Sequence, residues 1–236
     1  MLSSSSPTEV SSHAVFAKTM TVGPKIFFLS LFVVLGCEII ALSVIYHVSF
    51  SPLPVLAVER IVETGLLLFA VSAWDQGLPA IGLRKGETLV GLKRGFIWSA
   101  FFGLAALVFF SILIAARISP FEIIQATLPA NTKELVLFFL VGGLIAPIAE
   151  EVFFRGIIYG FFRRWGVVLA VLGTTLIFVA AHAVRAGVPL PQIVGGIVFA
   201  VAYEIEGNLM VPITIHVVGN AAIFSLCLLG EGVWPV

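Results

Sequence analysis

The stretch IAPIAEEVFFRGIIYGFFRRWG, residues Ile145–Gly166, places two adjacent carboxylates and an arginine inside an apolar run. A charged side chain at the centre of a membrane-spanning helix costs on the order of 3 kcal/mol on insertion scales. Glu150, Glu151 and Arg155 are therefore expected to face protein or water rather than lipid. They need either partners within the protein or a function.

The composition of the whole chain explains why this stretch is a membrane segment. The chain has 236 residues, of which 60% are hydrophobic and 11% are charged, and its mean hydropathy is +1.14. An ordinary soluble domain carries about 25% charged residues. Two cysteines, Cys37 and Cys227, both lie in apolar runs and form no CxxC motif. The sequence predicts an integral membrane protein that contacts membrane lipid and no nucleic acid.

Apolar runs along the chain predict an all-α, polytopic transmembrane bundle of about seven spans. A crossing helix needs roughly 20 apolar residues, so the chain is long enough for this number. The Ser-rich residues 1–24 are predicted to be a disordered cytoplasmic tail, and residues 25–236 a single integral membrane domain. The number of spans near 203–213 stays open, because Gly207, Asn208 and Pro212 interrupt the helix only briefly. The candidate spans are roughly 25–48, 53–74, 95–116, 135–160, 167–184, 190–210 and 212–230.

The distribution of lysine and arginine between these spans favours an N-terminus in the cytoplasm. In that orientation, residues 75–95 form a cytoplasmic, partly amphipathic loop, and the chain is expected in the plasma membrane. The basic residues on the cytoplasmic side are Lys18, Lys25, Arg84, Lys85, Lys93, Arg94, Arg163 and Arg164, against Arg117, Lys133 and Arg185 on the far side.

Helical spacing separates the two carboxylates of the opening stretch. Glu151 and Arg155 are four residues apart, so they can form an ion pair on one helix face. Glu150 lies about 100° further round the helix and is left without this partner. An unpaired carboxylate near a polar partner can take a proton from water, so Glu150 is a candidate general base.

Two further spans carry polar side chains at helical spacing. FVAAHAV places Phe178 and His182 on one helix face, and HVVGN does the same for His216 and Asn220. Counted from the ends of their helices, Glu150 and His182 both lie roughly 21–23 Å deep, so they can be neighbours. His216 is shallower by the same count, and reaching them requires a tilted helix or a break before it.

The ordered motifs EEVFFR, FVAAH and HVVGN resemble those of the CAAX protease and bacteriocin-processing enzyme (CPBP, or Abi) family. The resemblance covers about residues 135–225 and includes Gly156 and the approach YEIEGNLMVPITIH. It implies an intramembrane endopeptidase of glutamate type, similar to the CAAX prenyl endopeptidase. The expected substrate is a membrane-associated protein or peptide, and whether it is prenylated stays open, as does the oligomeric state.

The resemblance also implies roles for individual residues. Glu150 would be the general base, His182 its partner in activating water, and His216 and Asn220 the donors that stabilise the oxyanion. In supporting positions, Glu151 and Arg155 would shape the site, and Phe178 would pack against it.

Two alternatives accompany this interpretation. Glu150, His182 and His216 could form a His₂Glu zinc site, but no HExxH motif is present and the ligands come from three spans, so metal-free catalysis is favoured. A proton-coupled small transporter would also use buried Glu, His and Arg residues. The other ionisable residues of the spans could either form a structural network or contact the substrate. They are Glu38, Glu59, Arg60, Glu63, Glu204 and Glu206.

Overall fold

The computed structural model describes residues 21–74, 76–124, 126–182 and 189–230, and these residues are helical with short connections. The helix built from α5, α6 and α7 runs without interruption from Thr132 to Phe162 and continues as a 3-10 turn to Trp165. The other long helices are α2 (Pro24–His47), α3 (Leu53–Trp74), α4 (Thr88–Ala115), α8 (Val167–Ala181), α9 (Leu190–Glu206) and α10 (Met210–Gly230).

Seven long helices in the described part of the chain confirm the predicted all-α bundle of about seven spans. By length and composition, four of them can cross a membrane: α2, α4, the helix from Thr132 to Trp165, and α10. Helices α8 and α9 have 15 and 17 residues. At 1.5 Å per residue they are roughly 22–26 Å long, shorter than the hydrocarbon core of about 30 Å.

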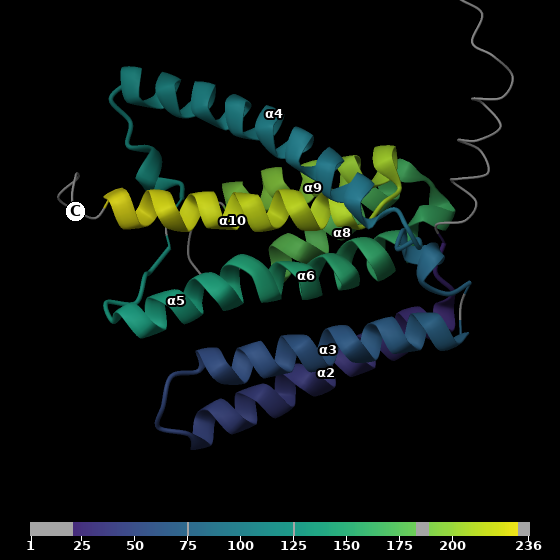
Figure 1. The fold of residues 1–236 in the computed structure, drawn as a ribbon. Coiled ribbons are helices and arrows are strands. Elements are labelled where there is room, and N and C mark those ends of the chain that lie inside the picture. Colours follow the sequence, from purple (N-terminus) through teal and green to yellow (C-terminus); the bar gives the residue numbers. More distant parts are fainter. Residues whose placement is uncertain (1–20, 75, 125, 183–188, 231–236) are drawn as a thin grey trace, which may run out of the picture.

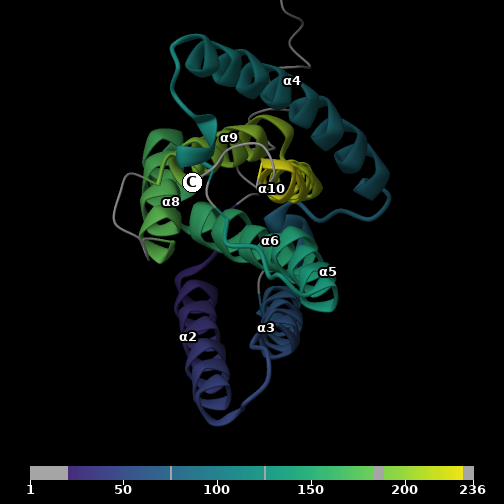
Figure 2. The ribbon, with the colours of Figure 1, turned by 90° about the vertical axis from the view of Figure 1, so that its left-hand side faces the viewer.

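The helices form three groups (Figures 1 and 2). Helices α2 and α3 make a hairpin on one side, α4 lies on the opposite side, and the remaining helices stand between them. Large apolar side chains on α2 and α4 are exposed, as expected of surfaces that face lipid. Most of the predicted tail lies outside the described residues, but Val22 is buried and its N–H donates to Gly160 O at 3.2 Å.

Helix α4 begins at Thr88, seven residues before the predicted start at 95. The polar residues of GETLVGLKRG indicated a loop, yet they continue the helix because its two faces differ. Lys93 and Arg94 are exposed on one face, whereas Gly91 and Gly95 are buried on the other. A Cβ atom on Gly95 would lie 2.8 Å from Thr214 Oγ1, so the glycine allows α4 to approach α10 closely.

We therefore expect Gly95→Ala to destabilise the protein, by about 1–3 kcal/mol, as overpacking does elsewhere. Gly103→Ala on the same helix is the matched control, because a Cβ atom there meets nothing within 4 Å. Thermal unfolding of the two purified variants measures the difference. Equal melting temperatures would show that α4 does not depend on this contact.

The connection between α9 and α10 sets the position of α10. Gly207 adopts a left-handed conformation with φ 53°, and Leu209 N–H donates to Gly82 O at 3.2 Å. Gly82 follows the 3-10 turn Leu78–Ile81, of which Ala80 and Ile81 are buried, and Ile81 packs against Gly156. Helix α10 thus starts inside the bundle, after a break in the preceding helix. His216 needs such a break to reach the depth of Glu150.

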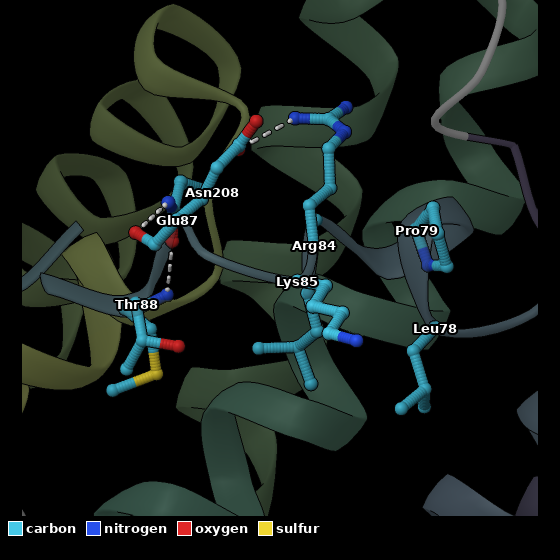
Figure 3. A pocket seen from close by; sticks show the side chains of 10 residues that line it. Leu78, Pro79, Arg84, Lys85, Glu87, Thr88 and Asn208 are labelled. Carbon is cyan, nitrogen blue, oxygen red and sulfur yellow. Dashed lines mark hydrogen bonds and ion pairs between the residues drawn. The ribbon is translucent and has the colours of Figure 1, made fainter. Parts of the chain in front are cut away.

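A pocket of about 490 Å³ lies beside this connection, where the 3-10 turn meets the starts of α4 and α10 (Figure 3). Asn208 Nδ2 donates to Glu87 O at 3.0 Å, and Arg84 NH1 donates to Gly207 O at 3.2 Å. Arg84 and Lys85 give the pocket a basic edge. The predicted catalytic residues do not line it.

Candidate active site

The helix that carries Glu150 and Glu151 is locally widened. Val141–Ile145 and Val152–Tyr159 are π-helical, and Ala146 N–H donates to Val141 O. The next residue, Pro147, has no N–H and cannot donate to the carbonyl of Gly142. Asn220 of α10 supplies the missing donor, with its Nδ2 atom 2.9 Å from Gly142 O. The proline therefore leaves a backbone acceptor that fixes α10 to the π-helical segment Val141–Ile145, which leads directly into α6 (Ala146–Glu151).

Glu151 and Arg155 form the ion pair that their spacing predicted. Arg155 NH1 lies 2.9 Å from Glu151 Oε1, and both side chains have 0% exposure. The guanidinium also donates to Gly196 O at 3.2 Å. Its central carbon lies 4.8 Å from the ring centroid of Phe178 and 5.1 Å from that of Phe199. The pair thus links the central helix to α8 and α9.

His216 is held by the same carboxylate. Its Nδ1 atom lies 2.7 Å from Glu151 Oε1, and its ring stacks on Phe199 with centroids 4.7 Å apart. Glu151 Oε1 thus contacts both Arg155 and His216. An ionised carboxylate only accepts hydrogen bonds, so Nδ1 of His216 donates. The Nε2 atom of His216 can therefore donate a hydrogen bond only when both ring nitrogens are protonated.

Glu150 faces both histidines. Its Oε2 atom lies 3.7 Å from His182 Nε2 and 3.8 Å from His216 Nε2. The side chain of Glu150 is 17% exposed and that of His182 31%, whereas Glu151 is fully buried. Glu150 and the two histidines are therefore neighbours, and Glu150 and His182, the pair predicted to activate water, are the partly exposed ones.

The position of His182 follows from the end of α8. His182 caps this helix, and its Nδ1 atom lies 2.8 Å from Phe178 O. A carbonyl oxygen only accepts, so Nδ1 carries the hydrogen, and in the neutral ring Nε2 keeps a lone pair that points toward Glu150. Phe178, predicted to be a packing residue, lies against this ring with centroids 4.4 Å apart.

The separation of Glu150 and His182 suits a shared water molecule. At 3.7 Å the two atoms are too far apart for a hydrogen bond, but one water can lie about 2.8 Å from each. Both atoms accept, so such a water donates both hydrogens and turns a lone pair away from them. This arrangement prepares the water oxygen for attack on an electrophile.

Asn220 lies one turn beyond His216 on α10. One N–H of its amide donates to Gly142 O, so the second N–H is left to donate to another acceptor. Its predicted role as an oxyanion donor stays a prediction. Sequence reasoning did not find Gly196 and Phe199, because a backbone carbonyl and an apolar ring carry no distinctive signal.

Zinc ligation requires three donor atoms around one point. Among the residues that the structure describes, one group brings three such donor atoms within 4.8 Å of one another. It consists of the carboxylates of Glu38, Glu59 and Glu63. Glu150, His182 and His216 do not meet this criterion, although Glu150 approaches each histidine separately.

Comparison with known proteins places the same segment in a family. Residues 132–222 match the family model for type II CAAX prenyl endopeptidase Rce1-like proteins. An Escherichia coli protein described as "Uncharacterized 24.3 kDa protein" is 33% identical over 91 residues, which cover 36% of this chain and 42% of that protein. The alignment thus spans less than half of the relative, and no solved structure matches. Residues 132–222, which hold all three motifs, form an Rce1-like domain of the CPBP family.

Proposed function

We propose that the protein is an intramembrane endopeptidase in which Glu150 activates water for hydrolysis of a peptide bond. The observation that carries the proposal is that the two adjacent carboxylates differ in burial and in contacts. Glu151 is fully buried and held by Arg155 and His216. Glu150 makes no such close contact and faces the Nε2 atoms of two histidines, at the accessible edge of the site.

The reaction uses these groups in order. Water shared by Glu150 and His182 attacks the carbonyl carbon of the substrate and gives a proton to Glu150. The doubly protonated ring of His216 donates its Nε2 hydrogen to the developing oxyanion, and the second N–H of Asn220 is the other donor. The tetrahedral intermediate then collapses, the carbon–nitrogen bond breaks, and the proton on Glu150 passes to the leaving amine.

Asn220→Ala is expected to lower the rate of the chemical step by roughly 10²–10³, as loss of one oxyanion donor does elsewhere, with little change in substrate binding. The same change removes the hydrogen bond to Gly142 O. Single-turnover rates and thermal unfolding, measured on the same preparation, separate the two effects. Loss of stability with an unchanged chemical step would assign Asn220 a structural role alone.

We also propose that catalysis needs no metal ion. In support, Glu150, His182 and His216 do not bring three donor atoms within 4.8 Å of one another among the described residues. If zinc were bound there, these three residues would hold it and it would polarise the attacking water.

Elemental analysis of active protein and treatment with a chelator test the metal-free proposal. We expect activity to persist after exhaustive chelation, with less than about 0.1 zinc per chain. One tightly bound zinc per chain that is lost and restored together with activity would overturn it.

The substrate class follows from the site and the family together. An accessible site inside a helical bundle suits a membrane-associated protein or peptide, and the family name points to a prenylated CAAX protein as the narrower possibility. With the N-terminus in the cytoplasm of a plasma-membrane protein, residues 75–87 lie on the cytoplasmic side.

The comparisons give no support to a transporter.

Mapping of new protein termini tests the proposed function. Membranes that contain the wild-type protein are compared with membranes that contain Glu150→Gln at equal abundance. We expect a set of termini in membrane-associated proteins that appears only with the wild type. Identical sets of termini would contradict the proposal.

A further inference from the structure

The pocket beside the connection between α9 and α10 combines apolar and charged walls. It has a volume of about 490 Å³, and the predicted catalytic residues do not line it. In Figure 3, the side chains of Arg84 and Lys85 lie between Glu87 on one side and Leu78 and Pro79 on the other. A cavity with both kinds of wall suits a ligand that has a polar head and an apolar body.

Hydrogen bonds hold two distant segments of the chain together around this pocket. The side chain of Asn208 donates through Nδ2 to Glu87 O and accepts at Oδ1 from Met210 N–H, both at 3.0 Å. Leu209 N–H donates to Gly82 O at 3.2 Å. Because backbone contacts of this kind fix the walls, the pocket is pre-formed and does not need a ligand to shape it.

The pocket carries an excess of positive charge. Lys85 is exposed and forms no ion pair within the described residues. Arg84 NH1 lies 3.2 Å from Gly207 O and 3.4 Å from Glu87 Oε2, and the side chain of Glu87 is 45% exposed. Two cations and one carboxylate leave one net positive charge, so the pocket attracts an anion.

The pocket lies at the level where lipid headgroups are expected. The helix ends at the right of Figure 1 include the starts of α4 and α10, which form part of its wall, and the end of the helix that runs to Trp165. Trp165 is exposed, as is typical of tryptophan at the membrane surface. Leu89 and Phe96, in the first turns of α4, are 71% and 59% exposed. An anion in the pocket can therefore carry acyl chains that lie along α4.

We propose that the pocket binds the phosphate group of an anionic phospholipid. Arg84 and Lys85 attract the phosphate, and the acyl chains follow the exposed apolar residues at the start of α4. The apolar wall formed by Leu78 and Pro79 contacts the glycerol carbons. Basic pockets between membrane helices bind lipid headgroups in this way. The inference is independent of the proposed function, because it uses no residue of the candidate active site.

A lipid in the pocket also contacts the helix that carries His216. Met210 is the first residue of α10 and a part of the pocket wall. A ligand that packs against Met210 binds the folded arrangement, in which α10 begins inside the bundle, and not the unfolded chain. Binding therefore raises the temperature of unfolding, which makes thermal unfolding a suitable measure.

A titration with lipids and with soluble anions tests the site. Full-length protein in dodecyl maltoside is titrated with dioleoyl-phosphatidylglycerol, dioleoyl-phosphatidylcholine, glycerol 3-phosphate or inorganic phosphate. We expect phosphatidylglycerol to bind about fivefold more tightly than phosphatidylcholine, whose choline cation is repelled by the basic residues, and the soluble anions to give no stabilisation. Equal binding of the two lipids overturns the inference. Stabilisation by glycerol 3-phosphate as large as that by phosphatidylglycerol would make this a site for soluble anions and overturn the lipid.

Two charge changes of opposite sign test the role of the basic residues. Lys85→Gln should weaken binding of phosphatidylglycerol about fivefold, as expected for loss of one cation near a lipid surface. Glu87→Gln should strengthen it, because the carboxylate beside Arg84 is removed while the backbone oxygen that binds Asn208 stays. Lys133→Gln, an exposed lysine at the start of α5, is the matched control and should leave binding unchanged. Equal losses in Lys85→Gln and Lys133→Gln, or no change in Lys85→Gln and Glu87→Gln, would mean that the lipid responds to diffuse charge and overturn the site.

A change of size without a change of charge tests the location. Thr88 lines the pocket and is exposed, so Thr88→Trp places a large side chain in the cavity. This variant should lose the preference for phosphatidylglycerol over phosphatidylcholine while unfolding near the wild-type temperature in detergent alone. A preference that persists in Thr88→Trp would place the lipid outside the pocket and contradict the inference.

Discussion

Glu150→Gln is expected to abolish peptide-bond cleavage while leaving the protein folded. Glutamine keeps the shape of the side chain and removes only the proton acceptor, and general-base catalysis contributes about 10²–10⁴ to the rate. Glu150 is 17% exposed and has no ion pair shorter than 3.7 Å, so its folding role is small. Cleavage of a mapped substrate in liposomes measures the rate, and thermal unfolding measures the fold.

Glu134→Gln is the matched control for this change, because it removes a carboxylate from the same continuous helix at its first turn. It should cleave at the wild-type rate and unfold at the wild-type temperature. Full turnover by purified Glu150→Gln would reject Glu150 as the base. A large drop in its melting temperature would instead assign Glu150 a structural role.

Arg155→Met is expected to be the most destabilising single change at the site, by about 3–5 kcal/mol. The guanidinium and Glu151 are both fully buried, so its removal takes away one of the two groups that hold this carboxylate and leaves only His216. The carbonyl of Gly196 also loses its donor. Unfolding of the purified variant gives the size of the effect, and activity should fall with it because Glu151 orients His216.

Arg94→Met provides the comparison for this prediction. Arg94 is paired with Glu206 at 2.5 Å, but its side chain is 50% exposed, so the expected cost is about 1 kcal/mol or less. Adding Glu151→Gln to Arg155→Met should recover part of the lost stability, since the buried charge is then removed. Similar costs for Arg155→Met and Arg94→Met would mean that the buried pair does not hold the helices together.

The helices and the charge pairing could be predicted from sequence because both depend on local spacing. Apolar runs gave the long helices to within a few residues, and four-residue spacing gave the Glu151–Arg155 pair. The start of α4 was misjudged because polar residues on its exposed face resembled a loop. The sign of a helix was instead the pair of buried glycines on its opposite face, Gly91 and Gly95.

Contacts between distant helices could not be predicted in the same way. The bond from Glu151 to His216 depends on where α10 begins, which is set by the contact between Leu209 and Gly82. The bond from Asn220 to Gly142 depends on a π-helical turn next to Pro147. The convergence of Glu38, Glu59 and Glu63 likewise needs the packing of α2 on α3. No local pattern contains this information.

Hydrolysis in ¹⁸O-labelled water by the purified, chelator-treated protein tests whether Glu150 activates water for peptide-bond cleavage without a metal ion. A substrate identified by terminus mapping is reconstituted with the protein in liposomes, and both fragments are analysed by mass spectrometry. We expect the wild type to produce a new carboxyl terminus containing one ¹⁸O atom from the attacking water, and Glu150→Gln to produce none. Labelled cleavage by Glu150→Gln at the wild-type rate, or no cleavage by the wild type, would contradict this expectation.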